Sequence, residues 1–316
     1  MNAAVPPLLV IAGPTATGKT GLSITVARAL AHEGIVAEII SADSRQVYRG
    51  LDIGTAKATA ADRDGVPHHG LDLVEPNEPF TLADFAAHAR DALAGIAARG
   101  GIAILVGGTG LYLRAVGRGI DTDALPSDPA VRASLEADLA QDGLQLLVDR
   151  LQAVAPRRAA RTDLRNPRRV VRALEIAAIE GDRDSPPPRG YGGPATWLGL
   201  SMDPATHREW IAKRARAQFD AGLIEEARSL RERFDPTLPA FSAIGYREAW
   251  AVIDGAIAVD TAIAEDTRRN VGFAKRQRTW FRAEPGIEWL DATDEQGAIT
   301  TALVRARALV TVANPR

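Results

Sequence analysis

The sequence of 316 residues contains no cysteine, which excludes disulfide bonds, thiolate-bound metals and a catalytic thiol. It also lacks a hydrophobic run long enough to cross a bilayer. The longest apolar stretch near the N-terminus, residues 5–12, is too short for a membrane span and has no basic flank, so we expect neither a membrane helix nor a signal peptide. These absences permit a reducing compartment, and we expect a cytoplasmic protein.

Lysine is scarce as well: only four of the 38 basic residues are lysines, so arginine is the default cation of this chain. One of the four, Lys19, completes the phosphate-loop pattern G-x-x-x-x-G-K-[ST]. A lysine at this position indicates a site that needs a slim point charge rather than a guanidinium fork. The loop and expected diphosphate site is Gly13-Pro14-Thr15-Ala16-Thr17-Gly18-Lys19-Thr20.

The surroundings of this loop are those that the motif requires. An apolar run, residues 8–11, precedes it and predicts a buried strand, and an amphipathic stretch, residues 21–31, follows it and predicts a helix. The loop N–H groups and the helix N-terminus would cradle a diphosphate that Lys19 neutralises, and the Thr20 hydroxyl can hold Mg²⁺. The motif alone does not identify the phosphate compound.

Net charge is small, −2, but positive charge is concentrated in two segments. Residues 157–172 hold seven arginines and one acid, and residues 268–282 hold six basic residues and no acid. Such blocks on a near-neutral protein indicate contact with a polyanion, although solvated helix faces in an arginine-rich chain would give the same pattern. The second block also interleaves aromatic residues, which either stack on unpaired bases or anchor a terminal helix in the core.

The order of apolar segments predicts an α/β fold, a parallel sheet with helices on both faces. We expect strands at residues 8–12, 37–41, 102–106, 197–202 and 287–290, and a helix at residues 82–98. Further helices are expected over residues 204–234 and 246–282. The strand–helix alternation breaks near Asp121, and residues 126–180 read as helical. We therefore predict a catalytic core of residues 1–121 and 196–316, with an all-helical insertion at residues 122–195.

Two polar residues follow strands at the edge where the phosphate loop lies. Asp43 comes just after the second strand, where a carboxylate can act as general base or help to hold Mg²⁺, or can simply cap a turn. Thr109 follows two glycines after the third strand, where an ATPase would usually carry an acid. The missing acid disfavours ATP hydrolysis. Arg214 lies on a predicted helix, either reaching an anion or solvated, and His68-His69 favours a structural loop over a metal site.

These motifs together resemble the tRNA dimethylallyltransferase family over residues 8–290, nearly the whole chain. The matching segments are the phosphate loop and residues 43–48, 54–57, 66–69, 107–112, 172–175, 244–248 and 275–282. The resemblance implies transfer of a dimethylallyl group from its diphosphate to N6 of the adenosine just 3′ of the anticodon. It also implies a P-loop kinase-like core with a mobile helical insertion, Mg²⁺ as cofactor, and a monomer that binds the tRNA anticodon stem-loop.

The resemblance also implies roles for individual residues. Asp43 would be the catalytic base, Thr109 a channel residue near the reaction, and Lys19 and Arg214 the diphosphate clamps. The tRNA contacts that it implies are Asp43, Ser44, Arg45, Gln46, Tyr48, Lys57, Arg165, Arg168, Arg169, Arg172, Gly245, Tyr246, Arg247, Lys275, Arg276, Gln277, Arg278, Trp280 and Arg282.

The chain departs from the family pattern at a few places, which put some tRNA contacts in question. They are Ala58, Gly70, Asn166, Trp210 and the spacing of residues 267–273. Three alternatives stay open: a dimethylallyltransferase acting on free adenylate, an ATP-dependent small-molecule kinase and a non-catalytic RNA-binding module. The helical insertion and basic blocks disfavour the first, and the missing acid disfavours the second. The third would leave Lys19, Thr20 and Asp43 without a task.

Overall fold

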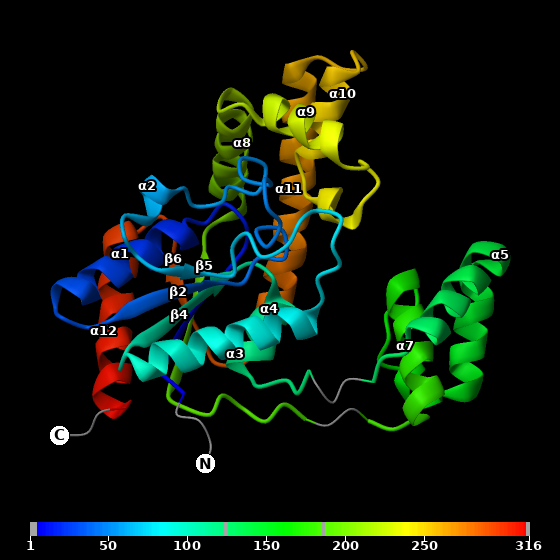
Figure 1. Cartoon of the computed structure of the whole chain (residues 1–316), viewed down its shortest axis with the longest axis horizontal. Helices are drawn as coiled ribbons and strands as arrows, with labels where there is room; N and C mark the ends of the chain where they lie inside the picture. The colour runs from blue at the N-terminus through cyan, green and yellow to red at the C-terminus, as the bar shows by residue number, and fades with distance from the viewer. Residues whose placement is uncertain (1–4, 123–125, 185–186, 314–316) are drawn as a thin grey trace. The chain divides into compact units, whose positions relative to one another are not determined.

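The computed structural model describes residues 5–122, 126–184 and 187–313. The chain forms two compact units: residues 1–120 with 190–316, and residues 121–189 (Figure 1). Residues 190–195, expected in the insertion, belong with the larger unit, because Gly190 N–H bonds Arg118 O at 2.9 Å and Leu8 N–H bonds Pro194 O at 2.9 Å. Within the described ranges no helix is both long and apolar enough to cross a membrane.

The larger unit is built on a six-stranded sheet, order β3-β2-β4-β1-β5-β6, whose named pairs are all parallel. Its strands are β1 (Leu8–Ala12), β2 (Ala37–Ser41), β3 (His68–His69), β4 (Ile102–Gly107), β5 (Ala195–Ser201) and β6 (Ile287–Asp291). This confirms the predicted α/β fold and its five strands within two residues at each end. The sixth, β3, is only two residues long and lies at the sheet edge, too short to produce a periodic signal.

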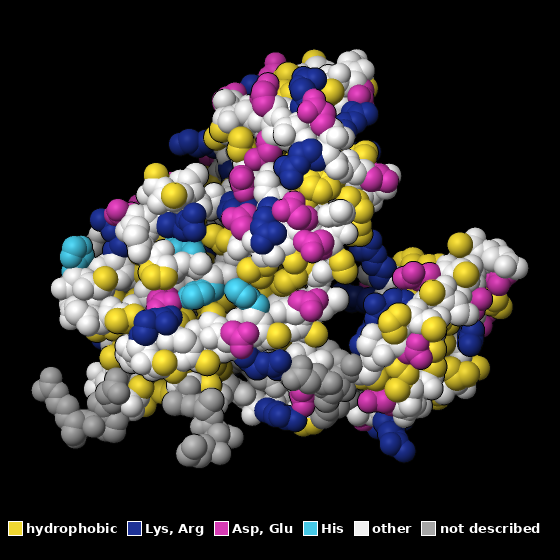
Figure 2. Space-filling model, in the orientation of Figure 1, with side chains coloured by type: hydrophobic (Ala, Val, Ile, Leu, Met, Phe, Trp, Pro, Cys, Tyr) yellow, Lys and Arg dark blue, Asp and Glu magenta, His cyan; other side chains and the backbone are white. Residues whose placement is uncertain are grey.

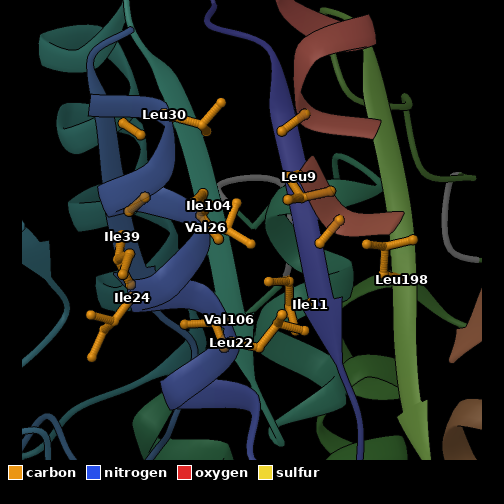
Figure 3. Packing of buried hydrophobic residues seen from close by; sticks show 14 of the residues in the cluster. Leu9, Ile11, Leu22, Ile24, Val26, Leu30, Ile39, Ile104, Val106 and Leu198 are labelled. Atoms are coloured by element: carbon orange, nitrogen blue, oxygen red, sulfur yellow. The ribbon is translucent and has the colours of Figure 1, made fainter. Parts of the chain in front are cut away.

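Helices cover both faces of this sheet because alternate strand residues point to opposite sides. Helices α1 (Lys19–His32) and α12 (Glu295–Ala313) pack on one face, where Leu9 and Ile104 are fully buried (Figures 1 and 3). Helices α3 (Leu82–Ala98) and α4 (Gly110–Gly117) pack on the other, against Leu8 and Leu105. The strands are therefore continuous apolar runs, as parallel strands buried on both faces require. Helix α12 was not predicted.

A third apolar cluster joins four helices beside the sheet: α8 (Pro204–Asp220), α9 (Leu223–Arg233), α10 (Tyr246–Ile253) and α11 (Val259–Arg282). The two long helices expected here are each broken once. Gly222, with φ of 103°, separates α8 from α9, and a turn containing Gly255, with φ of 70°, separates α10 from α11. Only glycine adopts such angles without strain, so these residues end the helices. The short helices are α2 (Ala60–Arg63) and the 3₁₀ turn Pro239–Ser242.

The smaller unit is helical and has its own core. It contains α5 (Pro129–Val154), α6 (Pro156–Ala159) and α7 (Pro167–Glu180). Apolar side chains of α5 and α7, among them Leu151 and Val170, are buried against each other. Glu175 is fully buried among them, and its charge is balanced by Arg132 at 2.9 Å and Arg172 at 2.7 Å. Pairing of this kind is what a buried carboxylate needs.

The carboxyl ends of β2 and β4 are held in backbone contact. Ala42 N–H donates to Val106 O at 2.7 Å, and Thr109 N–H donates to Ala42 O at 3.2 Å. A Cβ at Gly107 would lie 2.2 Å from Ala42 O, so this position has room for glycine alone.

We expect Gly107→Ala to lower the free energy of unfolding by about 1–3 kcal/mol, because the methyl group must push two backbones apart. Gly21→Ala is the matched control, because a Cβ at this site in α1 has nothing within 4 Å. The control should raise stability by about 0.5–1 kcal/mol through helix propensity. Urea unfolding monitored by circular dichroism measures both. Equal stabilities of the two variants would contradict the close backbone contact.

Candidate active site

The phosphate loop runs from β1 into α1 in the conformation that the motif predicts. Gly13 and Gly18 have φ of 148° and 79°, and a Cβ at Gly13 would lie 2.7 Å from Leu200 O. The Thr17 hydroxyl donates to Pro14 O at 2.9 Å and tightens the loop. The loop lines a pocket of about 260 Å³ at the N-terminus of α1. Helix N–H groups thus border a cavity of the size of a small phosphate compound.

Lys19 lies in this pocket with its ammonium group against the loop. Its Nζ donates to Pro14 O at 2.5 Å. Burial and, to a lesser extent, the nearby Arg214 lower the pKa of Lys19 to about 7, while Asp43 acts in the opposite direction. A bound diphosphate would favour the charged ammonium and raise this pKa again. The protonation state of Lys19 is therefore sensitive to what the loop binds.

Asp43 lies two residues after the end of β2 and lines the same pocket. One carboxylate oxygen, Oδ1, accepts a hydrogen bond from Arg45 N–H at 2.8 Å, which fixes the turn after the strand. The side chain is half-buried and faces a second pocket of about 570 Å³ as well. Asp43 therefore combines the two positions considered from the sequence. One of its oxygens caps the turn after β2, and the carboxylate group also borders both cavities.

Thr109 and Arg214 join this site from opposite sides. Thr109 Oγ1 accepts a hydrogen bond from Ser44 N–H at 3.1 Å and lines the second pocket. Arg214, on α8, donates from Nη1 to Thr15 Oγ1 at 2.7 Å and lines both pockets. Burial lowers the pKa of Arg214, but a guanidinium titrates so far above neutrality that it keeps its charge. Lys19 and Arg214 therefore place positive charge on the side of the pocket facing Asp43.

The second pocket is lined by arginines. Arg45 comes from the turn after β2, and Arg268, Arg269 and Arg276 come from α11. Exposed Phe273 lies among them, with the Arg276 guanidinium 5.8 Å from its ring centroid. Elsewhere, on the face in Figure 2, basic and acidic side chains of the larger unit are interspersed. A pocket with cations and an exposed ring suits a nucleotide and its flanking phosphates.

Three residues implied as tRNA contacts have side chains that are buried and already partnered within the protein. Lys57 Nζ binds Asp52 and Asp72, both at 2.6 Å, and Tyr48 O at 2.9 Å. The Tyr246 hydroxyl donates to Glu226 at 2.7 Å, and Gln277 bonds Thr15 N–H and Gly108 O. The polar ends of these three side chains are thus engaged within the protein, and Gln277 also lines both pockets of the site.

Four further residues implied as tRNA contacts also contact other parts of the protein. Tyr48 and Gly245 are buried, and Trp280 packs so closely on Gly110 that a Cβ there would lie 2.4 Å from its ring. Gln46 lines the loop pocket, accepting a hydrogen bond from Ser41 Oγ at 2.9 Å and donating to Thr55 O at 3.1 Å. Tyr48 and Gly245 are therefore buried and Trp280 is half-buried, while Gln46 lies on the phosphate-loop side of the site.

Several arginines of residues 157–172 are paired with acidic side chains, which the composition of this segment does not suggest. Arg157 and Arg161 both pair with Asp184 at 2.6 Å, and Arg172 pairs with buried Glu175. The exposed arginines of this block, Arg165, Arg168 and Arg169, lie around the start of α7. Asn166 caps this helix, because its Oδ1 accepts a hydrogen bond from Arg169 N–H. In the part of the chain that the structure describes, Arg168 has no ion-pair partner; the other two, Arg165 and Arg169, lie 3.7 and 4.0 Å from Asp163.

His207 is a site residue that the sequence analysis missed. It is buried on α8, and its Nε2 lies 2.8 Å from Thr15 O. Its spacing of seven residues from Arg214 puts both on one helix face. That spacing was the available signal, but a lone histidine in a helix carries no information about its partner.

The donor atoms around the loop suit Mg²⁺. Thr20 and Asp43 line one pocket and offer hydroxyl and carboxylate oxygens, the hard ligands that Mg²⁺ prefers. Among the described residues no group of three or more His, Cys, Asp or Glu side chains is placed to hold a metal. An ion held by one or two protein oxygens, substrate phosphate and water fits this arrangement. The His68-His69 pair forms β3, and His69 contacts Glu38 at 2.8 Å.

Comparison with known proteins identifies similar chains over nearly the full length. The IPP transferase family model matches residues 46–284. The chain is 45% identical to the tRNA dimethylallyltransferase of Anaeromyxobacter sp. (strain K), covering 95% of this chain and 98% of that protein. It is 41% identical to that of Geobacillus thermodenitrificans (strain NG80-2), covering 92% and 91%.

Solved structures agree. The full-length tRNA isopentenylpyrophosphate transferase from Bacillus halodurans matches with a TM-score of 0.68 at 37% identity, covering 96% of this chain and 98% of that one. A eukaryotic dimethylallyltransferase acting on tRNA matches with a TM-score of 0.77 at 26% identity, covering 96% and 78%.

Because Lys19 has a pKa of about 7, we expect diphosphate binding to be coupled to proton uptake. Below pH 7 the free ammonium is already charged; above it, binding must recharge the lysine. Affinity for dimethylallyl diphosphate without tRNA should therefore fall by up to about tenfold per pH unit above pH 7. The diphosphate itself is almost fully ionised above pH 7, since the second pKa of a phosphate group is about 6.

Lys19→Arg provides the control, because a guanidinium keeps its charge throughout this range. Its affinity, even if lower at pH 7, should stay flat as the pH rises. Calorimetric titrations at several pH values in buffers of different ionisation enthalpy would measure both the affinity and the protons taken up. The same pH dependence in wild type and variant would show that Lys19 does not titrate.

Proposed function

The chain belongs to the tRNA dimethylallyltransferase family and transfers a dimethylallyl group to an adenosine of tRNA; we propose that it takes this group from dimethylallyl diphosphate and attaches it to N6 of the adenosine directly 3′ of the anticodon. The observation that carries the proposal is the position of Asp43, which borders both the phosphate-loop pocket and the arginine-lined pocket. An acceptor base and a diphosphate donor can meet only where two such pockets join.

The reaction requires a base because the N6 lone pair of adenine is delocalised into the ring. As the N6–carbon bond forms, the allylic carbon–oxygen bond breaks and its electron pair leaves with the diphosphate. We assign the N6 proton to Asp43, whose carboxylate is anchored by Arg45 N–H at 2.8 Å. A held carboxylate loses less entropy on reaching its proton than a free one.

Negative charge that develops on the leaving diphosphate is met by the loop. Backbone N–H groups at the start of α1, Lys19 and Arg214 are assigned to its oxygens. Thr20 and the diphosphate would hold Mg²⁺, which supplies further charge neutralisation when bound. Thr109 lines only the second pocket, so we assign it to the nucleotide side.

The competing functions fit this site less well. A kinase would place an acid after β4 for its metal, and Gly107 has no room for a side chain. A free-adenylate enzyme would have little use for five arginines around the acceptor pocket, of which, among the residues that the structure describes, only Arg269 pairs with a buried acid, Glu248. It would have as little use for an exposed basic helix start on the smaller unit. We therefore retain tRNA as the acceptor, with Arg165, Arg168 and Arg169 as phosphate contacts.

Asp43→Asn should slow single-turnover transfer by about 10²–10⁴-fold, because the amide keeps the bond to Arg45 N–H but accepts no proton. Rapid-quench assays with labelled dimethylallyl diphosphate and saturating tRNA measure the rate, and filter binding should show tRNA affinity little changed. Asp64→Asn, an exposed aspartate of the same unit that pairs with Arg28 at 3.0 Å, is the control and should react normally. Near-normal turnover of Asp43→Asn would end the assignment.

The Arg168→Ala/Arg169→Ala double variant should bind tRNA more weakly, with a slope of log affinity against log salt reduced by roughly 0.7–0.9 for each lost contact. Transfer at saturating tRNA should stay intact. Arg157→Ala/Arg161→Ala is matched in lost charge, but both of its arginines pair with Asp184, so its slope should change little. Efficient prenylation of AMP that the first double change leaves unaffected would instead identify a free-adenylate enzyme.

A further inference from the structure

The loop residue Thr15 is held at every polar group by a side chain distant in sequence. Its N–H donates to Gln277 Oε1 at 2.8 Å, and its carbonyl accepts from His207 Nε2 at 2.8 Å. Its hydroxyl accepts from Arg214 at 2.7 Å. These partners come from α8 and α11, which pack against each other in the larger unit (Figure 1). We call the three side chains the Thr15 clamp.

Two members of the clamp, His207 and Gln277, are buried, and the hydrogen bonds of their polar ends go to main-chain atoms; Gln277 also lines both pockets. Gln277 donates from Nε2 to Gly108 O at 2.9 Å, so one amide joins the phosphate loop to the turn after β4. A Cβ at Gly108 would lie 2.4 Å from that nitrogen, so a side chain there would displace the Gln277 amide from this bond. His207 must carry its proton on Nε2 to donate to Thr15 O, and burial lowers the pKa of this histidine, favouring its neutral form.

The loop needs such support because its next residue is in an unfavourable conformation. Ala16 has φ of 57°, in the left-handed region that residues with a side chain avoid. Strained backbone of this kind persists only where the surroundings determine it. The loop is flanked by two glycines with positive φ, Gly13 and Gly18, which would otherwise let it move.

We propose that His207 and Gln277 are positioning residues for the diphosphate: by fixing Thr15 they hold the loop N–H groups in the orientation that binds phosphate oxygens. The inference rests on the proposed function, since it takes the loop to hold the diphosphate. It assigns Gln277 a task different from the tRNA contact that its segment implies. Gln277 lies on the buried face of α11, whereas its neighbours Lys275 and Arg276 are exposed.

The test uses Gln277→Met, which keeps shape but removes donor and acceptor, and His207→Leu, which removes the donor. His207→Gln is the conservative variant, because its amide N–H reaches about where Nε2 lies. Affinity for dimethylallyl diphosphate is measured by calorimetry without tRNA, tRNA affinity by filter binding, and KM for each substrate in steady state. Thr279→Ala on α11 and Glu209→Gln on α8, both exposed, are the controls.

We expect Gln277→Met and His207→Leu to weaken diphosphate binding and raise its KM by about ten- to a hundredfold, since each leaves a buried backbone group unpaired. His207→Gln should recover most of the affinity, and tRNA affinity should change less than about twofold. The exposed controls should match wild type. A general structural defect would not be rescued by glutamine, nor would it spare tRNA binding.

Unchanged diphosphate affinity in folded Gln277→Met, or weakened tRNA binding with intact diphosphate binding, would overturn the clamp. If Gln277→Met or His207→Leu fails to fold, His207→Gln decides: affinity near wild type supports the clamp, and a large loss contradicts it. Failure of the wild-type protein itself to bind dimethylallyl diphosphate would refute the proposed function, and the clamp with it.

Discussion

The site depends on one constraint, the backbone contact between the carboxyl ends of β2 and β4. Ala42 bonds Val106 through its N–H and Thr109 through its carbonyl. Because the strands are parallel, their next residues emerge at the same edge as the phosphate loop that follows β1. Asp43 and Thr109 are therefore delivered to the site by main-chain geometry, and their side chains need only small adjustments.

Near this backbone contact, the positive charges of Lys19 and Arg214 are offset in part by the negative charge of Asp43. Lys19 and Arg214 are both partly buried, and burial disfavours the charge of each. Asp43 opposes that effect on both cations, because its carboxylate attracts the positive charge of each. Neutral backbone N–H groups add attraction for phosphate without adding a charge that must be kept solvated.

The sequence allowed the sheet and the main site residues to be predicted because both have strong local signals. Buried strands are apolar runs, and the phosphate loop is a fixed pattern in a fixed context. The roles of Lys57, Tyr246 and Gln277 could not be predicted, because each is determined by a partner that only the fold brings near. Gln277 and Thr15, for example, are 262 residues apart in sequence.

The elements that the sequence analysis missed were too short for a periodic pattern of apolar residues, or had no clear difference between an apolar and a polar face. Strand β3 has two residues, and α12 has apolar residues all around it, with Val304 and Val312 exposed while Ala302 and Leu309 are buried. The breaks at Gly222 and Gly255 divide helical patterns that continue on both sides. In such places local propensity is overruled by packing, which the sequence does not show residue by residue.

The bond between Gly190 N–H and Arg118 O has a consequence for how this architecture can change. It means that the chain leaves and re-enters the larger unit at neighbouring main-chain positions, which this hydrogen bond of 2.9 Å joins. The helical unit between these crossings keeps its own apolar core and its own balanced buried charge. An insertion or deletion within residues 121–189 therefore leaves the two ends of the larger unit's chain joined as they are, and the pairing of β1 with β5 does not depend on the size of the helical unit.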